Sequence, residues 1–134
     1  MLQEILASHL GVKLGTYKHA VGSLHLYVRN KEDAQRFLDE GWQSTDEAMS
    51  PIPSGDPWPA IKSLLKAEGQ IRTTGTFQSN ILAGIDPYWA DLILLLQVFR
   101  CKKYNETKQI KVLCAKMASK FYFPFIEKVL GEPT

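Results

Sequence analysis

One stretch of this chain, residues 12–28, has the composition of a β-strand, and the remaining sequence is mostly helical in pattern. The stretch is rich in β-branched and aromatic residues, and Gly22 near its centre indicates a bend or a bulge. A single bent strand leaves backbone N–H and C=O groups unpaired at an edge, which proteins avoid. We therefore expect it to pair within its own hairpin, with a second copy of the chain, or with a missing piece of a larger protein.

Helical periodicity accounts for the sequence on both sides of that stretch. Apolar residues at spacings of three and four predict a short helix over residues 2–10, which Gly11 ends. A second helix follows Asn30, which can cap it, and Gly41 ends it. We therefore assign the chain to the α+β class, predominantly helical, with a short bent strand at about residues 12–28 packed against several helices.

Two Asp-Pro pairs mark the starts of longer helices. Asp56-Pro57 and Asp86-Pro87 each place a capping carboxylate before a proline, which is favoured in the first helical turn. Asn105 is expected to cap a further helix. The apolar faces of these three helices are, in order, Ile61, Leu64, Leu65 and Ile71; Trp89, Leu92, Ile93, Leu96 and Phe99; and Ile110, Leu113, Cys114, Met117 and Phe121.

The chain length of 134 residues indicates one domain, residues 1–134. Within it we expect a helix-strand-helix segment over residues 1–43, a proline-rich loop over residues 44–59 and a helical region over residues 60–134. No apolar run approaches the roughly 20 residues needed to cross a bilayer, and the first residues do not resemble a signal peptide. We therefore expect a cytoplasmic protein without a membrane partner.

The last third of the chain is basic, with eight Lys and Arg residues against three Asp and Glu residues from residue 97 onward. These lysines could form a phosphate-binding surface. Their helical spacing opposite an apolar stripe is more typical of a solvated face, and only one of the eight is an arginine. We therefore expect no nucleic-acid partner.

The two cysteines, Cys101 and Cys114, fall on helical patterns. Neither has a second cysteine or a histidine at metal-ligand spacing, because the three histidines all lie upstream of residue 26. We interpret both as reduced thiols in or near the core. The sequence contains no nucleophile–base pair, no phosphate-cradling glycine loop and no metal cluster, so we expect no catalytic residue, cofactor or metal.

The motif GSLHLY, residues 22–27, carries the candidate binding residues, His25 and Tyr27. On a strand, residues two apart share a face, so both polar side chains would lie opposite Leu24 and Leu26. An imidazole and a phenol hydroxyl can each donate or accept a hydrogen bond, which suits a sugar hydroxyl. The alternative is a polar pair satisfied by a neighbouring helix or a partner strand.

The first 30 residues, MLQEILASHLGVKLGTYKHAVGSLHLYVRN, resemble the middle of thymidylate synthase. In that family a helix precedes a strand that carries a glycine and an aromatic residue and then Gly-Asp-x-His-x-Tyr. The matching positions begin at Gly15 and Tyr17, and Ser23 replaces the aspartate of the motif. The resemblance implies that His25 and Tyr27 hydrogen-bond the sugar hydroxyl of a pyrimidine deoxynucleotide.

The resemblance also implies that this chain is the C-terminal portion of such a protein, without the half that carries the catalytic cysteine and the phosphate-binding arginines. We therefore expect a partial nucleotide-binding domain of unknown cellular role, without stand-alone catalysis, and either a short gene of a mobile cassette or a fragment. A homo-oligomer, preferably a dimer, would cover the unpaired strand. Two alternatives are a split enzyme completed by a partner chain and a helical protein-interaction module that no longer binds nucleotide, with Trp58 as an anchor.

Overall fold

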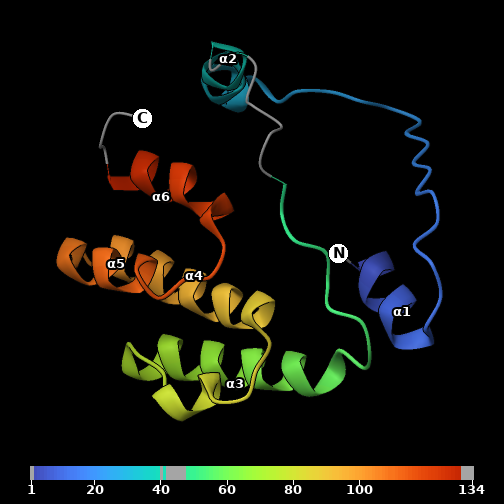
Figure 1. The fold of residues 1–134 in the computed structure, drawn as a ribbon. Helices are drawn as coiled ribbons and strands as arrows, with labels where there is room; N and C mark the ends of the chain where they lie inside the picture. Colours follow the sequence, from blue (N-terminus) through green and yellow to red (C-terminus); the bar gives the residue numbers. More distant parts are fainter. Residues whose placement is uncertain (1, 40, 42–47, 131–134) are drawn as a thin grey trace. The chain divides into compact units, whose positions relative to one another are not determined.

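The computed structural model describes residues 2–39, 41 and 48–130 (Figure 1). The chain divides into two compact units. One unit combines Met1–Leu14 with Met49–Thr134, and the other is Gly15–Ala48. The first part of the predicted loop over residues 44–59 lies outside the described residues.

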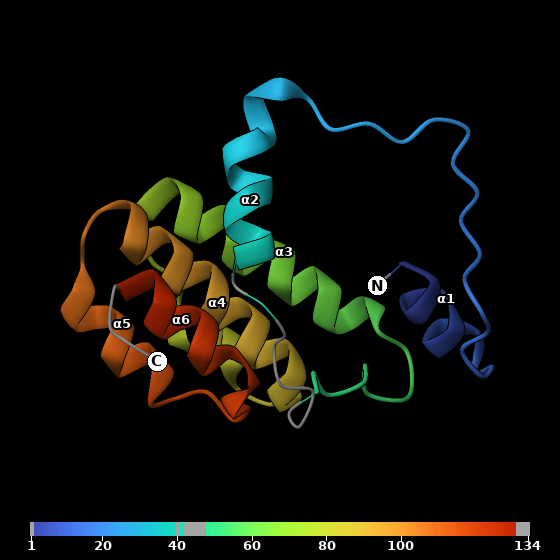
Figure 2. The same ribbon diagram turned by 90° about the horizontal axis from the view of Figure 1, so that it is seen from above.

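The first unit is built on two long helices that lie side by side, α3 (Trp58–Thr74) and α4 (Pro87–Lys103) (Figures 1 and 2). The start signal at Asp86-Pro87 is confirmed, whereas α3 begins one residue later than Asp56-Pro57 predicts, with Pro57 at its N-cap position. Asp56 Oδ1 accepts a hydrogen bond from the Trp58 N–H at 3.2 Å, and Asp86 Oδ1 accepts one from the Tyr88 N–H at 2.9 Å. Each carboxylate therefore satisfies a backbone donor that the first turn of a helix leaves unpaired.

Three shorter helical elements complete the layer on the other side of α4. These are α5 (Thr107–Cys114), the 3₁₀ turn η3 (Lys120–Tyr122) and α6 (Phe123–Leu130). The hydrophobic core forms where α4, α5 and α6 meet. Its buried members are Leu94, Val98, Cys101, Ile110, Met117, Tyr122 and Ile126.

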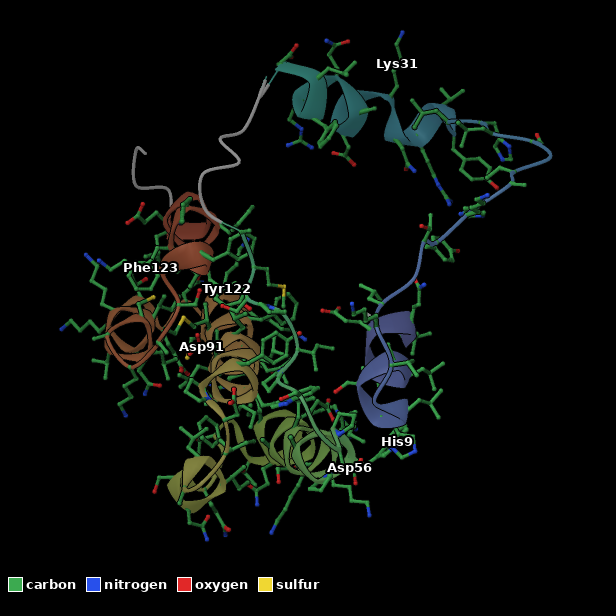
Figure 3. The ribbon with its side chains drawn as sticks, turned by 45° about the vertical axis from the view of Figure 1, so that its right-hand side comes forward. His9, Lys31, Asp56, Asp91, Tyr122 and Phe123 are labelled. Carbon is green, nitrogen blue, oxygen red and sulfur yellow. The ribbon has the colours of Figure 1, made fainter. Side chains whose placement is uncertain are left out.

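A buried carboxylate ties α4 to the chain that leads into η3. Asp91 is only 2% exposed, and its two oxygens accept hydrogen bonds from the N–H groups of Ala118 at 2.9 Å and Ser119 at 2.8 Å. Figure 3 shows Asp91 beside Tyr122, which follows that connection. Because both oxygens are satisfied by backbone donors, a carboxylate can remain in the core at this point.

The helix α1 (Leu2–Leu10) belongs to the same unit and confirms the predicted bounds 2–10. It has no buried residue, and polar contacts hold it to the loop before α3. The Ser8 hydroxyl donates to the carbonyls of Pro53 at 3.1 Å and Gly55 at 2.9 Å, and Glu4 Oε1 accepts from the Ile52 N–H at 3.3 Å.

The described residues of both units contain no strand, so the predicted α+β class and the strand at 12–28 are wrong. Residues 12–27 form neither a helix nor a strand. A 3₁₀ turn, η1 (Val28–Asn30), then leads into α2 (Lys31–Asp39). A strand is defined by hydrogen bonds to a neighbouring strand, and no second strand exists among the described residues to supply them. The composition indicated an extended backbone but could not supply its partner.

Helix α2 does not bury its apolar side chains. Phe37 and Leu38 follow helical spacing, yet both side chains are exposed, and α2 has no buried residue. Other predictions for the first unit are also wrong. Leu65 is 61% exposed and Phe99 is 70% exposed, although both were expected on the apolar faces of their helices. Asn105 adopts a left-handed conformation, φ 59°, in the turn before α5 instead of capping it. Asparagine tolerates this conformation better than most residues.

No helix in the described ranges is both long and apolar enough to cross a membrane.

Candidate functional site

The two predicted binding residues, His25 and Tyr27, lie together on the extended segment of the second unit. Their ring centroids are 5.0 Å apart, and the ring planes meet at 88°, which is an edge-to-face arrangement. Both side chains are exposed, and neither makes a hydrogen bond to another described residue. The imidazole nitrogens and the phenol oxygen are therefore free to bind a ligand.

A third residue, Arg29, joins this pair and was missed in the sequence. Its guanidinium carbon lies 5.2 Å from the centre of the Tyr27 ring, within cation–π distance. Arg29 has no ion-pair partner in the part of the chain that the structure describes. The signal was available, because Arg29 continues the two-residue spacing of His25 and Tyr27. We call these three residues the His-Tyr-Arg site.

The arrangement can bind a hydroxyl and an anion side by side. The Tyr27 ring lies close to both the His25 imidazole and the Arg29 guanidinium, so three groups that can form hydrogen bonds are gathered on one short segment. A guanidinium recognises phosphate or carboxylate oxygens through paired N–H groups. A second aromatic–histidine contact, Tyr17 with His19 at 5.9 Å, occurs earlier on the same segment without an arginine beside it.

Trp58, the expected anchor for a protein partner, is partly covered within its own unit. The ring of His9 meets the Trp58 ring edge-on at 5.9 Å, and His9 Nδ1 lies 3.3 Å from Asp56 Oδ1 (Figure 3). These contacts connect α1 to the start of α3. They give His9 and Trp58 a structural explanation that requires no ligand.

Cys101 is a free and fully buried thiol, and Cys114 is a free and partly buried one, which confirms the prediction of reduced thiols. Burial raises the pKa of both thiols, so both stay protonated near neutral pH. The Cys101 Sγ lies 3.5 Å from Glu106 Oε2, and Glu106 also forms an ion pair with Arg100. A thiolate is the nucleophilic form of cysteine, so neither residue is suited to nucleophilic catalysis in this state.

A cavity of about 540 Å³ lies between the C-terminal ends of α3 and α4. Arg72, Arg100 and Lys103 line it together with Tyr104. Two of these cations are already engaged: Arg72 pairs with Glu68 at 3.0 Å, and Arg100 pairs with Glu106 and lies 4.6 Å from the Tyr104 ring centre. The charges therefore stabilise the helix ends, whose carbonyls carry partial negative charge.

Across residues 2–39, 41 and 48–130, no three His, Cys, Asp or Glu side chains lie close enough together to hold a metal ion. Comparisons with protein-family models, with curated proteins and with solved structures gave no match. The function must therefore be inferred from the residues and their geometry.

Proposed function

We propose that this chain is a thymidylate-synthase-like C-terminal domain that contacts a pyrimidine deoxynucleotide through the His-Tyr-Arg site and has no catalytic activity on its own. The observation that carries the proposal is the pair of exposed rings, 5.0 Å apart, whose polar atoms have no partner among the described residues. Such a pair can donate and accept hydrogen bonds at a sugar hydroxyl at little desolvation cost.

Arg29 extends the proposal to the charge of the nucleotide. A deoxynucleotide carries a hydroxyl and a phosphate on the same sugar, and the Tyr27 ring lies close to both an imidazole and a guanidinium. Because exposed charged contacts are weak in water, we expect millimolar affinity from these three residues alone. Tight binding would require further groups from another chain.

The exposed apolar side chains of the extended segment support an incomplete site. Leu24 is 92% exposed and Val28 is 90% exposed, and further apolar side chains of the same segment are also exposed: Tyr17, Val21 and Leu26. Uncovered apolar surface on this scale typically marks an interaction site. An extended backbone can add to another strand, so we propose that a second copy of this chain covers it as a homodimer.

The second candidate function, a subunit of a split enzyme, rests on the same exposed segment. In that case a different chain supplies the covering strand together with a reactive cysteine. Because burial raises the pKa of Cys101 and Cys114, the nucleophile of such an enzyme would come from the other chain. Light scattering distinguishes the two candidates, because only the first gives a dimer from the purified chain alone.

The test of nucleotide contact is a titration of the ¹⁵N-labelled chain with deoxyuridylate. We expect amide shifts at residues 24–29 at millimolar ligand and their loss in His25→Ala. The matched control is His19→Ala, which removes the other exposed histidine of the same segment and should leave the shifts unchanged. An absence of shifts at millimolar ligand, or equal loss in both variants, would refute the proposed contact.

A further inference from the structure

A second cavity, of about 490 Å³, lies among the 3₁₀ turn η2 (Ser79–Leu82), α4 and α5. Its size is within the range of small-molecule sites. The apolar part of its lining comes from all three elements and includes Phe77, Leu82, Leu94 and Leu113. Its polar part includes Gln97, Lys108 and Lys116. The cavity belongs to the first unit and shares no residue with the His-Tyr-Arg site.

Gln97, one of the residues that line this cavity, is buried, and the oxygen of its side-chain amide accepts no hydrogen bond from the described residues. It is 3% exposed, and its Nε2 donates to the Gly75 carbonyl oxygen at 2.8 Å. Its Oε1 is buried and has no hydrogen-bond partner among the described residues. Exchanging the amide oxygen and nitrogen would set two acceptor oxygens 2.8 Å apart, so the hydrogen bond to Gly75 fixes the orientation. An acceptor buried without a donor costs free energy, which a ligand N–H or O–H would recover once a shift of the cavity lining admits it to Oε1.

The other polar groups are two exposed lysines on the α5 side of the cavity. Lys108 is in the first turn of α5, and Lys116 follows its last turn. Neither has an ion-pair partner in the described ranges. An ammonium group near the mouth of a cavity attracts anions. The cavity thus combines an apolar lining, one internal acceptor and two cations.

We propose that this cavity binds a small amphipathic anion. Its apolar or aromatic body would contact Leu82 and Leu94, an N–H or O–H group would donate to Gln97 Oε1, and its anionic group would face Lys108 and Lys116. Each of the three requirements comes from a different part of the lining. The inference does not depend on the proposed nucleotide contact.

Indole-3-acetate is a suitable probe, because it unites an aromatic body, an N–H donor and a carboxylate. In a titration of the ¹⁵N-labelled chain, we expect shifts of the Gln97 side-chain amide and of the α5 backbone, with a low-millimolar Kd. Two comparison compounds each lack one feature: 1-methylindole-3-acetate has no N–H, and 3-methylindole has no carboxylate. We expect about fivefold weaker binding of the first, the value of one neutral hydrogen bond.

The lysines are tested by the double variant Lys108→Ala/Lys116→Ala, with Lys102→Ala as the control. All three lysines are exposed, but Lys102 does not line the cavity. The double variant should bind indole-3-acetate about fivefold more weakly and bind 3-methylindole unchanged, since only the carboxylate senses the charge. Circular dichroism verifies that the helices are intact. No shift of Gln97 with indole-3-acetate, equal binding of all three compounds, or equal weakening by the control variant would overturn the proposal.

Discussion

Helix α4 and the extended segment 15–28 contain similar apolar residues, but the two regions bury them very differently. Leu94 in α4 is 2% exposed, whereas Leu24 in the segment is 92% exposed. The difference lies in the neighbours, because α4 packs against α3 and α5, while the segment has no strand partner among the described residues. The apolar sequence therefore predicts packing contacts for both regions. Whether those contacts form within this chain depends on which elements the fold places beside each region.

Polar groups show the same contrast. In α4, both oxygens of Asp91 accept backbone hydrogen bonds, and Gln97 uses its amide nitrogen inside the fold. In the extended segment, His25 and Tyr27 are exposed beside each other and bond to no described residue. The first set of polar groups is used to hold the structure, and the second remains available to a ligand.

The largest difference between the regions should appear on shortening a leucine. Leu94→Ala removes buried methyl groups from the core and should lower the free energy of unfolding by about 2–5 kcal/mol. Leu24→Ala, the same change in the extended segment, should lower it by less than about 0.5 kcal/mol at protein concentrations dilute enough to keep the chain monomeric. Urea unfolding followed by circular dichroism measures both values. A similar loss in the two variants would show that Leu24 is buried in solution.

The next contrast compares the substitution of a buried aspartate with that of an exposed one. Asp91→Ala leaves the N–H groups of Ala118 and Ser119 without acceptors, and we expect a loss of about 2–4 kcal/mol. Asp33→Ala removes an exposed ion pair with Arg36 on α2 and should cost less than about 1 kcal/mol. The same unfolding experiment applies. Equal effects would contradict a structural role for the buried carboxylate.

Alanine substitutions of two glycines, one in each region, should differ less in their effect on stability. Gly75 ends α3 with φ +85°, and a Cβ there would lie 2.6 Å from Arg100 Nη2. Gly75→Ala should therefore cost about 1–2 kcal/mol, from the left-handed backbone and the displaced arginine. Gly22 in the extended segment has open space around it, so Gly22→Ala should change the thermal midpoint very little. A destabilised Gly22→Ala variant would indicate a turn that needs glycine.

The smallest expected effect is a pH dependence of the free energy of unfolding, which arises in the first unit from Cys101. Burial raises the pKa of the Cys101 thiol, so the folded state retains a proton that the unfolded state loses above about pH 8.5. The stability contributed by the protonated thiol is fully present below that pH and is lost as the pH rises toward the folded-state pKa. Urea unfolding between pH 8 and pH 10 should show this loss, and Cys101→Ala should reduce its slope. An unchanged slope would assign the effect to other groups.

The helices were predictable because their signals are local. Asp86 caps the helix that begins directly after it, and Asp56 accepts a hydrogen bond from the first residue of α3, so a few neighbouring residues contain the information. The prediction of a strand at residues 12–28 failed, because strand formation depends on a partner that the segment itself cannot specify. Asp91 was missed for the same reason, since the donors that permit its burial come from Ala118 and Ser119, far along the chain.

The candidate site was predicted in part. The two-residue spacing of His25 and Tyr27 does bring their rings together, although the backbone between them is not a strand. Arg29 follows the same spacing and was missed because the predicted strand ended at Val28. The buried acceptor of Gln97 could not be foreseen, because the sequence shows a polar residue in an apolar helix but not which of its atoms are paired.

Amide hydrogen exchange at low and high protein concentration tests most directly whether the extended segment is half of an interface. We expect the amides of residues 93–98 in α4 to exchange slowly at both concentrations, because they lie in the core. Amides of residues 24–28 should exchange rapidly in dilute solution and become protected as a second copy binds. Protection of residues 24–28 that is strong and independent of concentration would show that the chain already covers this segment itself, and would contradict the account.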